Sequence, residues 1–357
     1  MTPPHLLVAI SGHGFGHAGQ TLPVLQALRQ RRPDVWLTLS TAVPRWFLES
    51  RLDPPFEVVT GGREAGMVMN SPSVVDREAS ADLYARMLGD WEANVAEETA
   101  FLDRLRPDGV LANVPVLPLA AAARRGLPCA AMCSLNWAAV YNAYCAHRPE
   151  AGDVHARLRD TYAAADAFLR VTPGLAMDDL PNRRCVGPIG RVGQARPIRR
   201  RLGLDPDTRV GLVTFGGIGG ERPLAEWPRR DGWVWGVQAE AAPDRPDVVD
   251  LGSLGETFTD LVASVDVLVT KTGYGTFVEA TLAGTPVVYE QRPAWPEGPP
   301  LAAWLAAHNR RLAVDADTMR AGTFVDALPA LLDQAAPPPP TPHGIDEAAC
   351  ELEKLIG

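Results

Sequence analysis

The sequence predicts an α/β fold made of two doubly wound domains that face each other across a cleft. Three observations lead to this prediction. Short apolar runs alternate with longer amphipathic stretches along most of the chain, a pattern typical of parallel sheets covered by helices on both faces. The 357 residues exceed the roughly 100–200 that one typical core accommodates. The alternation stops at a stretch rich in Gly, Pro and Arg, residues 186–209, and then resumes.

The first domain is expected to span residues 1–190. Its helices include "TLPVLQALRQRR" and "ADLYARMLGDWEANVAEETAFLDRLR", in which apolar residues recur at three- and four-residue spacing. Its strands are expected at 6–11, 35–40, 56–60, 109–113, 128–133 and 167–171.

The second domain is expected to span residues 191–334. Its strands are expected in "RVGLVTFGG", "DVVDLG", "DVLVTKTG" and "TPVVYEQ". Three tryptophans should pack its interior: Trp227, Trp233 and Trp235. A third segment, 335–357, begins with a Pro-rich break and ends in a helix at 345–356.

The bulk composition excludes several classes of function. A net charge of −9 disfavours a general nucleic-acid surface or an anionic membrane patch, so we expect no nucleic acid among the partners. Five irregularly spaced cysteines without a CxxC pair indicate reduced thiols. No apolar run approaches the roughly 20 residues of a transmembrane helix, and the N-terminus lacks the basic segment of a secretory signal. We therefore expect a cytoplasmic protein without a transmembrane segment; its oligomeric state is not predicted.

The stretch "SGHGFGHAGQ", residues 11–20, follows the first apolar run and contains a GxGxxG pattern. Dinucleotide binding would require an acidic residue at the end of the second strand. That region reads "VWLTLSTAVPRW" and has none, which disfavours a dinucleotide site. His13 and His17 have the i, i+4 spacing of a metal pair on a helix. Glycines between them disfavour a helix, so we expect no metal.

What remains is a loop whose glycines let a ligand approach the backbone closely. A helix follows, and no acidic residue occupies positions 18–32 to neutralise its positive end. His17 at the start of that helix could act as a general base, since its unperturbed pKa lies near neutrality. It could equally stabilise the turn by hydrogen bonding to the backbone, and spacing alone leaves both interpretations open.

The second domain contains a longer pattern, "DVLVTKTGYGTFVEATLAGTPVVYEQRPAWPE", residues 266–297. Four residues supply hydroxyls and amides at a predicted helix N-terminus, a favourable site for a diphosphate: Thr272, Gly273, Gly275 and Thr276. Glu279 follows one turn later, where its carboxylate could accept from ribose hydroxyls. Lys271 precedes the turn and could screen phosphate charge. A second Gly-rich turn, "FGGIGG" at 215–220, also follows a strand.

Together these motifs resemble those of GT-B glycosyltransferases, specifically family 28 and its relatives. The peptidoglycan-precursor N-acetylglucosaminyltransferases have a similar Gly-His loop, a Gly-Gly turn and a Ser-Gly…Glu helix. "SGHGFGHA" followed by "TKTGYGTFVEA…GTPVVYEQR…WPE" is closer still to the glycosyltransferase-like domain of plant arabinokinases. The resemblance implies two Rossmann-like domains and an enzyme that takes a nucleoside-diphosphate sugar and an acceptor as its small-molecule substrates.

The resemblance also implies roles for particular residues. His17 would be the catalytic or acceptor-orienting imidazole, with Asn113 beside it. The donor would be held by Gly14, Gly16, Gly216, Gly217, Gly219, Ser253, Thr272, Gly273, Tyr274, Gly275, Thr276, Glu279, Arg292 and Glu297. The acceptor would contact His13, Asn136, Trp137 and Tyr141, although packing of these aromatic residues into the core is an equal alternative. Asp76 or Glu78 could be an alternative base.

Three positions depart from the pattern of the relatives. Asn113 stands where relatives often have Asp, so it cannot stabilise an imidazolium by charge. Ala138 stands where relatives often have an acidic residue. Gly298 follows Glu297 where an acidic–Gln pair usually grips the donor sugar.

We therefore expect an inverting, metal-independent and cofactor-free glycosyltransferase that uses a UDP-linked sugar and an unidentified acceptor. Two alternatives remain open. A non-catalytic sugar-nucleotide-binding or regulatory protein would bind the donor without turnover, and a GT-B sugar-nucleotide epimerase would form product without an acceptor.

Overall fold

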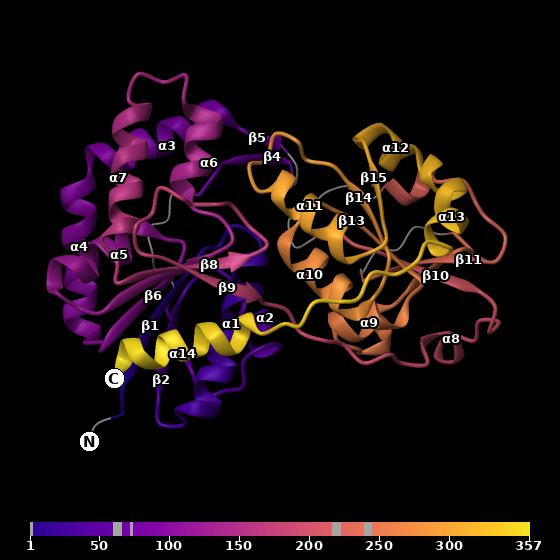
Figure 1. Ribbon diagram of the computed structural model, residues 1–357, viewed down its shortest axis with the longest axis horizontal. Helices are drawn as coiled ribbons and strands as arrows, with labels where there is room; N and C mark the ends of the chain where they lie inside the picture. The colour runs from indigo at the N-terminus through magenta and orange to yellow at the C-terminus, as the bar shows by residue number, and fades with distance from the viewer. Residues whose placement is uncertain (1–2, 60–65, 72–73, 216–222, 239–244) are drawn as a thin grey trace. The chain divides into compact units, whose positions relative to one another are not determined.

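A computed structural model describes residues 3–59, 66–71, 74–215, 223–238 and 245–357 (Figure 1). The chain forms two compact units. Unit 1 comprises Met1–Ile189 and His343–Gly357, and unit 2 comprises Gly190–Pro342.

Unit 1 is built on a sheet of seven parallel strands in the order β3-β2-β1-β6-β7-β8-β9. Its central strands are almost wholly apolar because helices cover both faces of the sheet. The strands are β1 (His5–Ile10), β2 (Trp36–Ser40), β3 (Glu57–Val59), β6 (Gly109–Asn113), β7 (Cys129–Cys133), β8 (Ala167–Thr172) and β9 (Arg183–Pro188). A separate antiparallel pair consists of β4 (Met69–Ser71) and β5 (Val74–Val75).

The helices of unit 1 divide between the two faces of this sheet. Figure 1 shows α1 and α14 on one side and α3 to α7 on the other. The helices are α1 (Gly16–Arg31), α2 (Arg45–Glu49), α3 (Arg77–Gly89), α4 (Trp91–Leu105), α5 (Val116–Arg125), α6 (Trp137–Cys145), α7 (Ala151–Ala163) and α14 (Gly344–Ile356).

The C-terminal helix α14 belongs to unit 1 and packs against α1 and β9. Leu352 is fully buried there. Glu347 Oε2 accepts a hydrogen bond from the Gly187 amide at 2.7 Å. Arg31 of α1 pairs with Glu353 at 2.7 Å. The helix expected at 345–356 therefore exists, and its packing partner, which the sequence left open, is the first sheet.

Unit 2 is built on six parallel strands in the order β12-β11-β10-β13-β14-β15. Figure 1 shows α9 to α11 on one side of this sheet and α12 and α13 on the other. The strands are β10 (Arg209–Val213), β11 (Trp233–Val237), β12 (Val248–Asp250), β13 (Val267–Lys271), β14 (Val287–Glu290) and β15 (Arg311–Val314). The α-helices are α8 (Ile198–Arg201), α9 (Phe258–Ser264), α10 (Tyr274–Ala283), α11 (Gly298–His308), α12 (Ala316–Ala321) and α13 (Leu328–Leu332).

The predicted tryptophan packing of unit 2 is confirmed. Trp227, Trp233 and Trp235 are buried in one apolar cluster with residues of α12 and α13. The basic run that precedes β10 is neutralised by carboxylates of the same unit. Arg196 donates twice to Asp260, at 2.8 and 3.0 Å, and Arg199 pairs with Asp266.

Each sheet reverses its strand order at one point, between β1 and β6 in unit 1 and between β10 and β13 in unit 2. Ligands of doubly wound sheets bind outside the carboxyl ends of the strands at such a point. The predicted glycine loops follow β1 and β13, so each lies beside the switch point of its own sheet. Within the described ranges, no helix has the length and apolar character needed to cross a membrane.

Candidate active site

The glycine loop of unit 1 places His17 at the start of α1, beside the end of β6. Gly14 has φ +78°, a left-handed conformation that favours glycine, and its amide donates to the Gly12 carbonyl at 2.8 Å. Helix α1 begins at Gly16 without an acidic residue in its first turn. His17 is therefore the second helical residue, and only 7% of it is exposed.

Asn113, the last residue of β6, fixes the tautomer of His17. The amide nitrogen of Asn113 donates to the Thr21 hydroxyl at 2.9 Å and to the His17 carbonyl at 3.3 Å. Since a carbonyl can only accept, the Asn113 oxygen must be the atom that faces His17 Nδ1, at 2.9 Å. An amide oxygen cannot donate, so Nδ1 carries the hydrogen and the neutral ring presents the lone pair of Nε2. This arrangement is suited to a general base.

A buried thiol also approaches the same ring nitrogen. Cys133 Sγ, at the end of β7, lies 3.6 Å from His17 Nδ1. A Cys–His pair can be a nucleophile and its base, but then the imidazole must accept the thiol proton. Nδ1 already carries a hydrogen, so this geometry does not make Cys133 a nucleophile.

The residues expected to contact the acceptor lie at different depths. His13 is half-buried, and its ring meets Trp137 edge-on at 5.4 Å. Asn136 caps α6 by accepting the Ala139 amide at 2.8 Å. Trp137 is 1% exposed and its ring centroid lies 5.7 Å from that of His17. These residues surround the imidazole.

Tyr141 differs, because it lies in the core of unit 1. It is fully buried and packs on Tyr84 at 4.8 Å, and burial raises the pKa of Tyr141 to about 12. It therefore has no exposed surface to offer an acceptor, and the alternative interpretation, an aromatic residue packed into the core, describes it.

In unit 2, α10 begins directly after β13 with Gly273 as its N-cap. The first N–H groups of a helix have no intrahelical acceptor. Among the described residues no side chain caps this end, and its first turn has no acidic residue. No described heavy atom lies within 4 Å of a Cβ built on Gly275. This end of α10 is suited to an anion.

The two threonines of this turn serve the fold as well. The Thr272 hydroxyl donates to the Glu290 carbonyl at 2.9 Å, and the Thr276 hydroxyl donates to the Gly273 carbonyl at 3.2 Å. Their hydrogens are therefore engaged, and the backbone amides, including that of Tyr274, are the donors the turn can offer a phosphate. Glu279 lies one turn further along α10 and is 5% exposed.

Positive charge gathers beside the same turn. Lys271 ends β13, opposite Glu290 of β14. Burial, reinforced by the positive charge of Arg292, lowers the pKa of Lys271 to about 8, against the opposing attraction of Glu290. The Arg292 guanidinium lies 4.8 Å from the Trp295 ring centroid. Trp295 Nε1 in turn donates to Glu297 Oε2 at 3.4 Å. Sequence analysis noted Lys271 but left it outside the predicted donor site.

The remaining predicted donor residues are distributed as follows. Gly216, Gly217 and Gly219 lie outside the described residues. Ser253 is exposed in a short turn after β12, where its hydroxyl donates to the Asp250 carbonyl at 2.8 Å. Gly16 has no described heavy atom within 4 Å of a built Cβ.

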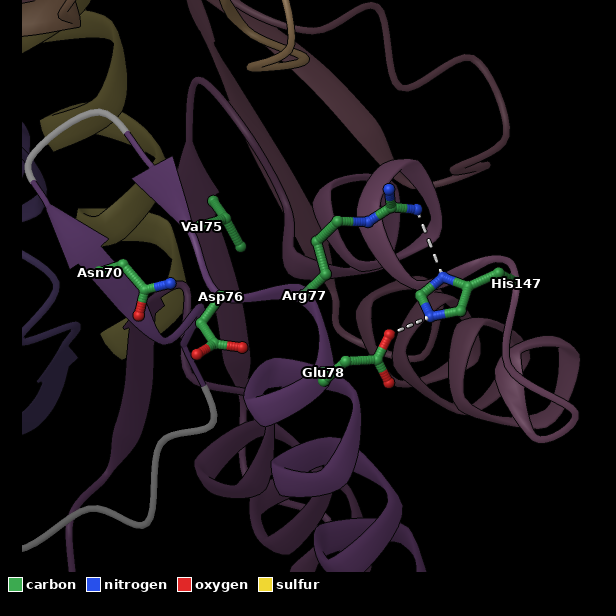
Figure 2. Close-up of a pocket in the computed structure, with 6 residues that line it drawn as sticks. All are labelled: Asn70, Val75, Asp76, Arg77, Glu78 and His147. Atoms are coloured by element: carbon green, nitrogen blue, oxygen red, sulfur yellow. Dashed lines mark hydrogen bonds and ion pairs between the residues drawn. The ribbon is translucent and has the colours of Figure 1, made fainter.

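A separate hollow of about 420 Å³ opens on unit 1 where α3 begins (Figure 2). It is lined by Asn70, Val75, Asp76, Arg77, Glu78 and His147. Asp76 Oδ1 caps α3 by accepting the Ala79 amide at 2.9 Å. Hydrogen bonds from His147, at 2.8 Å, and from Arg148 hold the pKa of Glu78 below its ordinary value. The two carboxylates named as alternative bases thus have structural partners.

Metal ligands were also sought. Within the part of the chain that the structure describes, no three His, Cys, Asp or Glu side chains are grouped so as to hold a metal ion.

Comparisons with known proteins bear on both sites. No protein-family model matches the chain. L-arabinokinase of Arabidopsis thaliana is 27% identical over 310 residues, which cover 83% of this chain but only 29% of the relative. The chain thus spans less than a third of that relative's length. UDP-N-acetylglucosamine--N-acetylmuramyl-(pentapeptide) pyrophosphoryl-undecaprenol N-acetylglucosamine transferase of Clavibacter michiganensis is 28% identical over 345 residues, 91% of this chain and 87% of the relative.

Solved structures share the fold over the whole chain. The calicheamicin glycosyltransferase CalG4 has a TM-score of 0.63 at 18% identity, covering 100% of this chain and 94% of that one. A UDP-GlcNAc 2-epimerase from Neisseria meningitidis has a TM-score of 0.59 at 13% identity, covering 98% of each chain. The predicted α/β fold and the predicted resemblance to GT-B glycosyltransferases are confirmed. The relatives and the shared fold together support an enzyme of the glycosyltransferase type.

Proposed function

We propose that the chain transfers a sugar from a UDP-linked donor to an acceptor, with inversion at the anomeric carbon and without a metal. The observation that carries this proposal is the hydrogen bond between His17 Nδ1 and Asn113 Oδ1, which leaves the Nε2 lone pair for the acceptor proton. The Clavibacter relative, whose name includes UDP-N-acetylglucosamine, supports a uridine donor.

The donor is assigned to unit 2. Backbone amides of the first turn of α10, at Gly275 and Thr276, accept the diphosphate, and Lys271 and Arg292 supply the positive charge that a metal would otherwise supply. The Glu279 carboxylate holds the ribose hydroxyls. Gly216, Gly217, Gly219, Ser253 and Glu297 complete the proposed contacts with phosphate, nucleobase and sugar.

The reaction is a single displacement. Nε2 of His17 takes the proton from the acceptor nucleophile, which forms a bond to the anomeric carbon. The bond from that carbon to the diphosphate oxygen breaks, and UDP leaves with the electron pair. Inversion follows from one displacement. Asn113 holds the imidazole in the reactive tautomer, and His13, Asn136 and Trp137 position the acceptor. The proposal requires both units to contribute to one reaction.

A transfer assay tests the proposal. Purified protein is incubated with a panel of UDP-sugars and a panel of hydroxyl acceptors, and the glycosylated product is measured by mass spectrometry. We expect His17→Ala to lower turnover by about 10²–10⁴-fold, the usual contribution of a general base. His13→Ala is the matched control from the same loop, and we expect it to raise KM while largely retaining kcat. Equal turnover in wild type and His17→Ala would remove the histidine from the mechanism.

The same assay addresses an epimerase, the alternative favoured by the fold shared with the Neisseria enzyme. An epimerase converts the UDP-sugar when no acceptor is present, whereas a transferase depends on one. Donor binding without turnover across the acceptor panel would instead indicate a sugar-nucleotide-binding protein.

A further inference from the structure

Three aromatic side chains gather on the surface of unit 1 beside the glycine loop: Phe15, Trp46 and Phe47. We refer to them as the aromatic corner. Trp46 is 63% exposed, the largest exposed fraction among the large apolar side chains of the described residues. Exposing an indole to water is unfavourable in proportion to its apolar area, and exposed apolar patches commonly mark binding sites.

The rings are arranged as two walls. Phe15 and Phe47 stack at 4.4 Å with an angle of 16° between their planes. The indole of Trp46 stands across both, at 85° to Phe15 and 82° to Phe47, with centroids 5.6 and 5.7 Å away. A flat ring entering this corner could stack on one wall and meet the other edge-on, the two favourable geometries for aromatic pairs.

Neighbouring cations cover other rings and leave Trp46 open. The guanidinium of Arg51 lies 5.3 Å from the Phe47 centroid, and that of Arg45 lies 5.6 Å from the Phe56 centroid. Arg45 also pairs with Glu49 at 2.7 Å. Charges of both signs therefore surround the indole, so the apolar surface is limited to about one ring and does not extend as a membrane-binding face would.

The corner is continuous with the proposed base. Phe15 is the N-cap of α1, two residues before His17. A Cβ built on Gly12 would lie 3.2 Å from the Ala42 Cβ, so the loops that follow β1 and β2 are in contact. Both loops lie at the carboxyl edge of the sheet, where ligands of such folds bind.

We propose that the aromatic corner binds a planar aryl group of the acceptor and holds it beside His17. This inference rests on the proposed function, because it assumes that an acceptor hydroxyl reacts at His17. Trp46 is assigned as a specificity-determining residue. It favours aryl acceptors over aliphatic ones and has no part in donor binding.

The test uses umbelliferone, a planar and fluorescent phenol, as both ligand and acceptor. Its binding is measured by fluorescence titration without any donor. We expect Trp46→Ala to weaken binding about tenfold, in line with the contribution of an aromatic contact and its buried area, and Trp46→Phe to retain part of it. Trp36→Ala is the matched control, because Trp36 is also exposed, at 37%, but begins β2 at the opposite edge of the sheet.

Transfer from UDP-sugars to umbelliferone and to cyclohexanol is then compared. We expect Trp46→Ala to reduce kcat/KM for umbelliferone about tenfold, leaving cyclohexanol and UDP binding unchanged. Equal umbelliferone binding by wild type and Trp46→Ala, or none by wild type, would overturn the inference. Phosphatidylglycerol vesicles that sediment wild type but not Trp46→Ala would also overturn it, in favour of a membrane contact. Trp46-dependent binding with no transfer by wild type would leave the aryl site standing and contradict the proposed function instead.

Discussion

His17 Nδ1 and Asn113 Oδ1 lie 2.9 Å apart and join the first helix of unit 1 to the end of its central strand β6. Because Asn113 also donates to Thr21 and to the His17 carbonyl, its amide has one orientation. A neutral side chain thus orients the imidazole without adding charge. The relation predicts how the protein responds when that neutrality is changed.

Replacing Asn113 by Asp should place a carboxylate against the Nδ1 hydrogen. An opposite charge stabilises the imidazolium, so the pKa of His17 should rise by about one unit or more relative to wild type. A base must be neutral to act, so the acid limb of the kcat/KM profile should move to higher pH. Unchanged limbs in Asn113→Asp would contradict the proposed contact.

Removing the orienting group is a separate experiment. Asn113→Ala should reduce kcat about 10–100-fold, the range found when a hydrogen-bond partner of a functional histidine is removed. UDP affinity, assigned to unit 2, should not change. Cys133→Ala is the matched control at the same nitrogen, and we expect a much smaller loss of kcat because the thiol has no proposed role.

The open space at Gly275 predicts separate effects on folding and binding. Alanine is a better helix former than glycine, so Gly275→Ala should not lower the free energy of unfolding of unit 2. A methyl group where the diphosphate must approach should raise the Kd for UDP about tenfold, within the 1–3 kcal/mol typical of overpacking. Gly19→Ala, equally open but in α1, should leave the Kd unchanged in calorimetric titration. Wild-type affinity in Gly275→Ala would move the diphosphate away from α10.

Lys271 predicts a pH dependence of donor binding. Its pKa is about 8 in the unliganded protein, and a bound diphosphate stabilises the ammonium form. Binding therefore takes up a proton above pH 8, and UDP affinity should fall as pH rises through about 8. Lys271→Arg keeps its charge and should bind without this fall, whereas Lys271→Met should bind weakly at every pH. A Kd for the wild type that is flat between pH 7 and 10 would contradict a contact between Lys271 and phosphate.

The C-terminal helix predicts a stability effect confined to unit 1. Leu352 is fully buried against the first sheet, so Leu352→Ala should lower the free energy of unfolding of unit 1 by about 2–5 kcal/mol. Lys354 lies two residues along α14 with an exposed side chain, and Lys354→Ala should change it by less than about 0.5 kcal/mol. Chemical denaturation monitored by circular dichroism measures both. Equal stabilities would mean that α14 is dispensable.

The sequence predicted the fold where strands are continuously apolar, as at 109–113 and 167–171, because buried parallel strands require that composition. It missed β9, whose first residues, Arg183 to Cys185, are polar or exposed at the edge of the sheet. It also treated 81–106 as one helical pattern, since α3 and α4 share an uninterrupted periodicity. The break at Asp90 changes the chain direction without changing that pattern.

The candidate site was predictable in its residues more than in its contacts. Composition and spacing identified His17, yet left open whether it acts as a base or supports the turn. The decisive contact, with Asn113, joins residues far apart in the chain. Tyr141 was expected to face an acceptor, but helical spacing could not tell which face of α6 is buried. The "GFGH" stretch held a signal for the aromatic corner, since a large apolar residue, Phe15, stands among glycines in an exposed loop.

Calorimetric titration of the purified chain with UDP, GDP, ADP and TDP tests the central claim most directly, repeated on Glu279→Ala, Glu279→Gln and His17→Ala. The account predicts that UDP binds most tightly, that Glu279→Ala loses this binding, that Glu279→Gln retains part of it, and that His17→Ala retains it fully. No binding of any diphosphate, or equal UDP affinity in wild type and Glu279→Ala, would contradict the assignment of a donor site to unit 2.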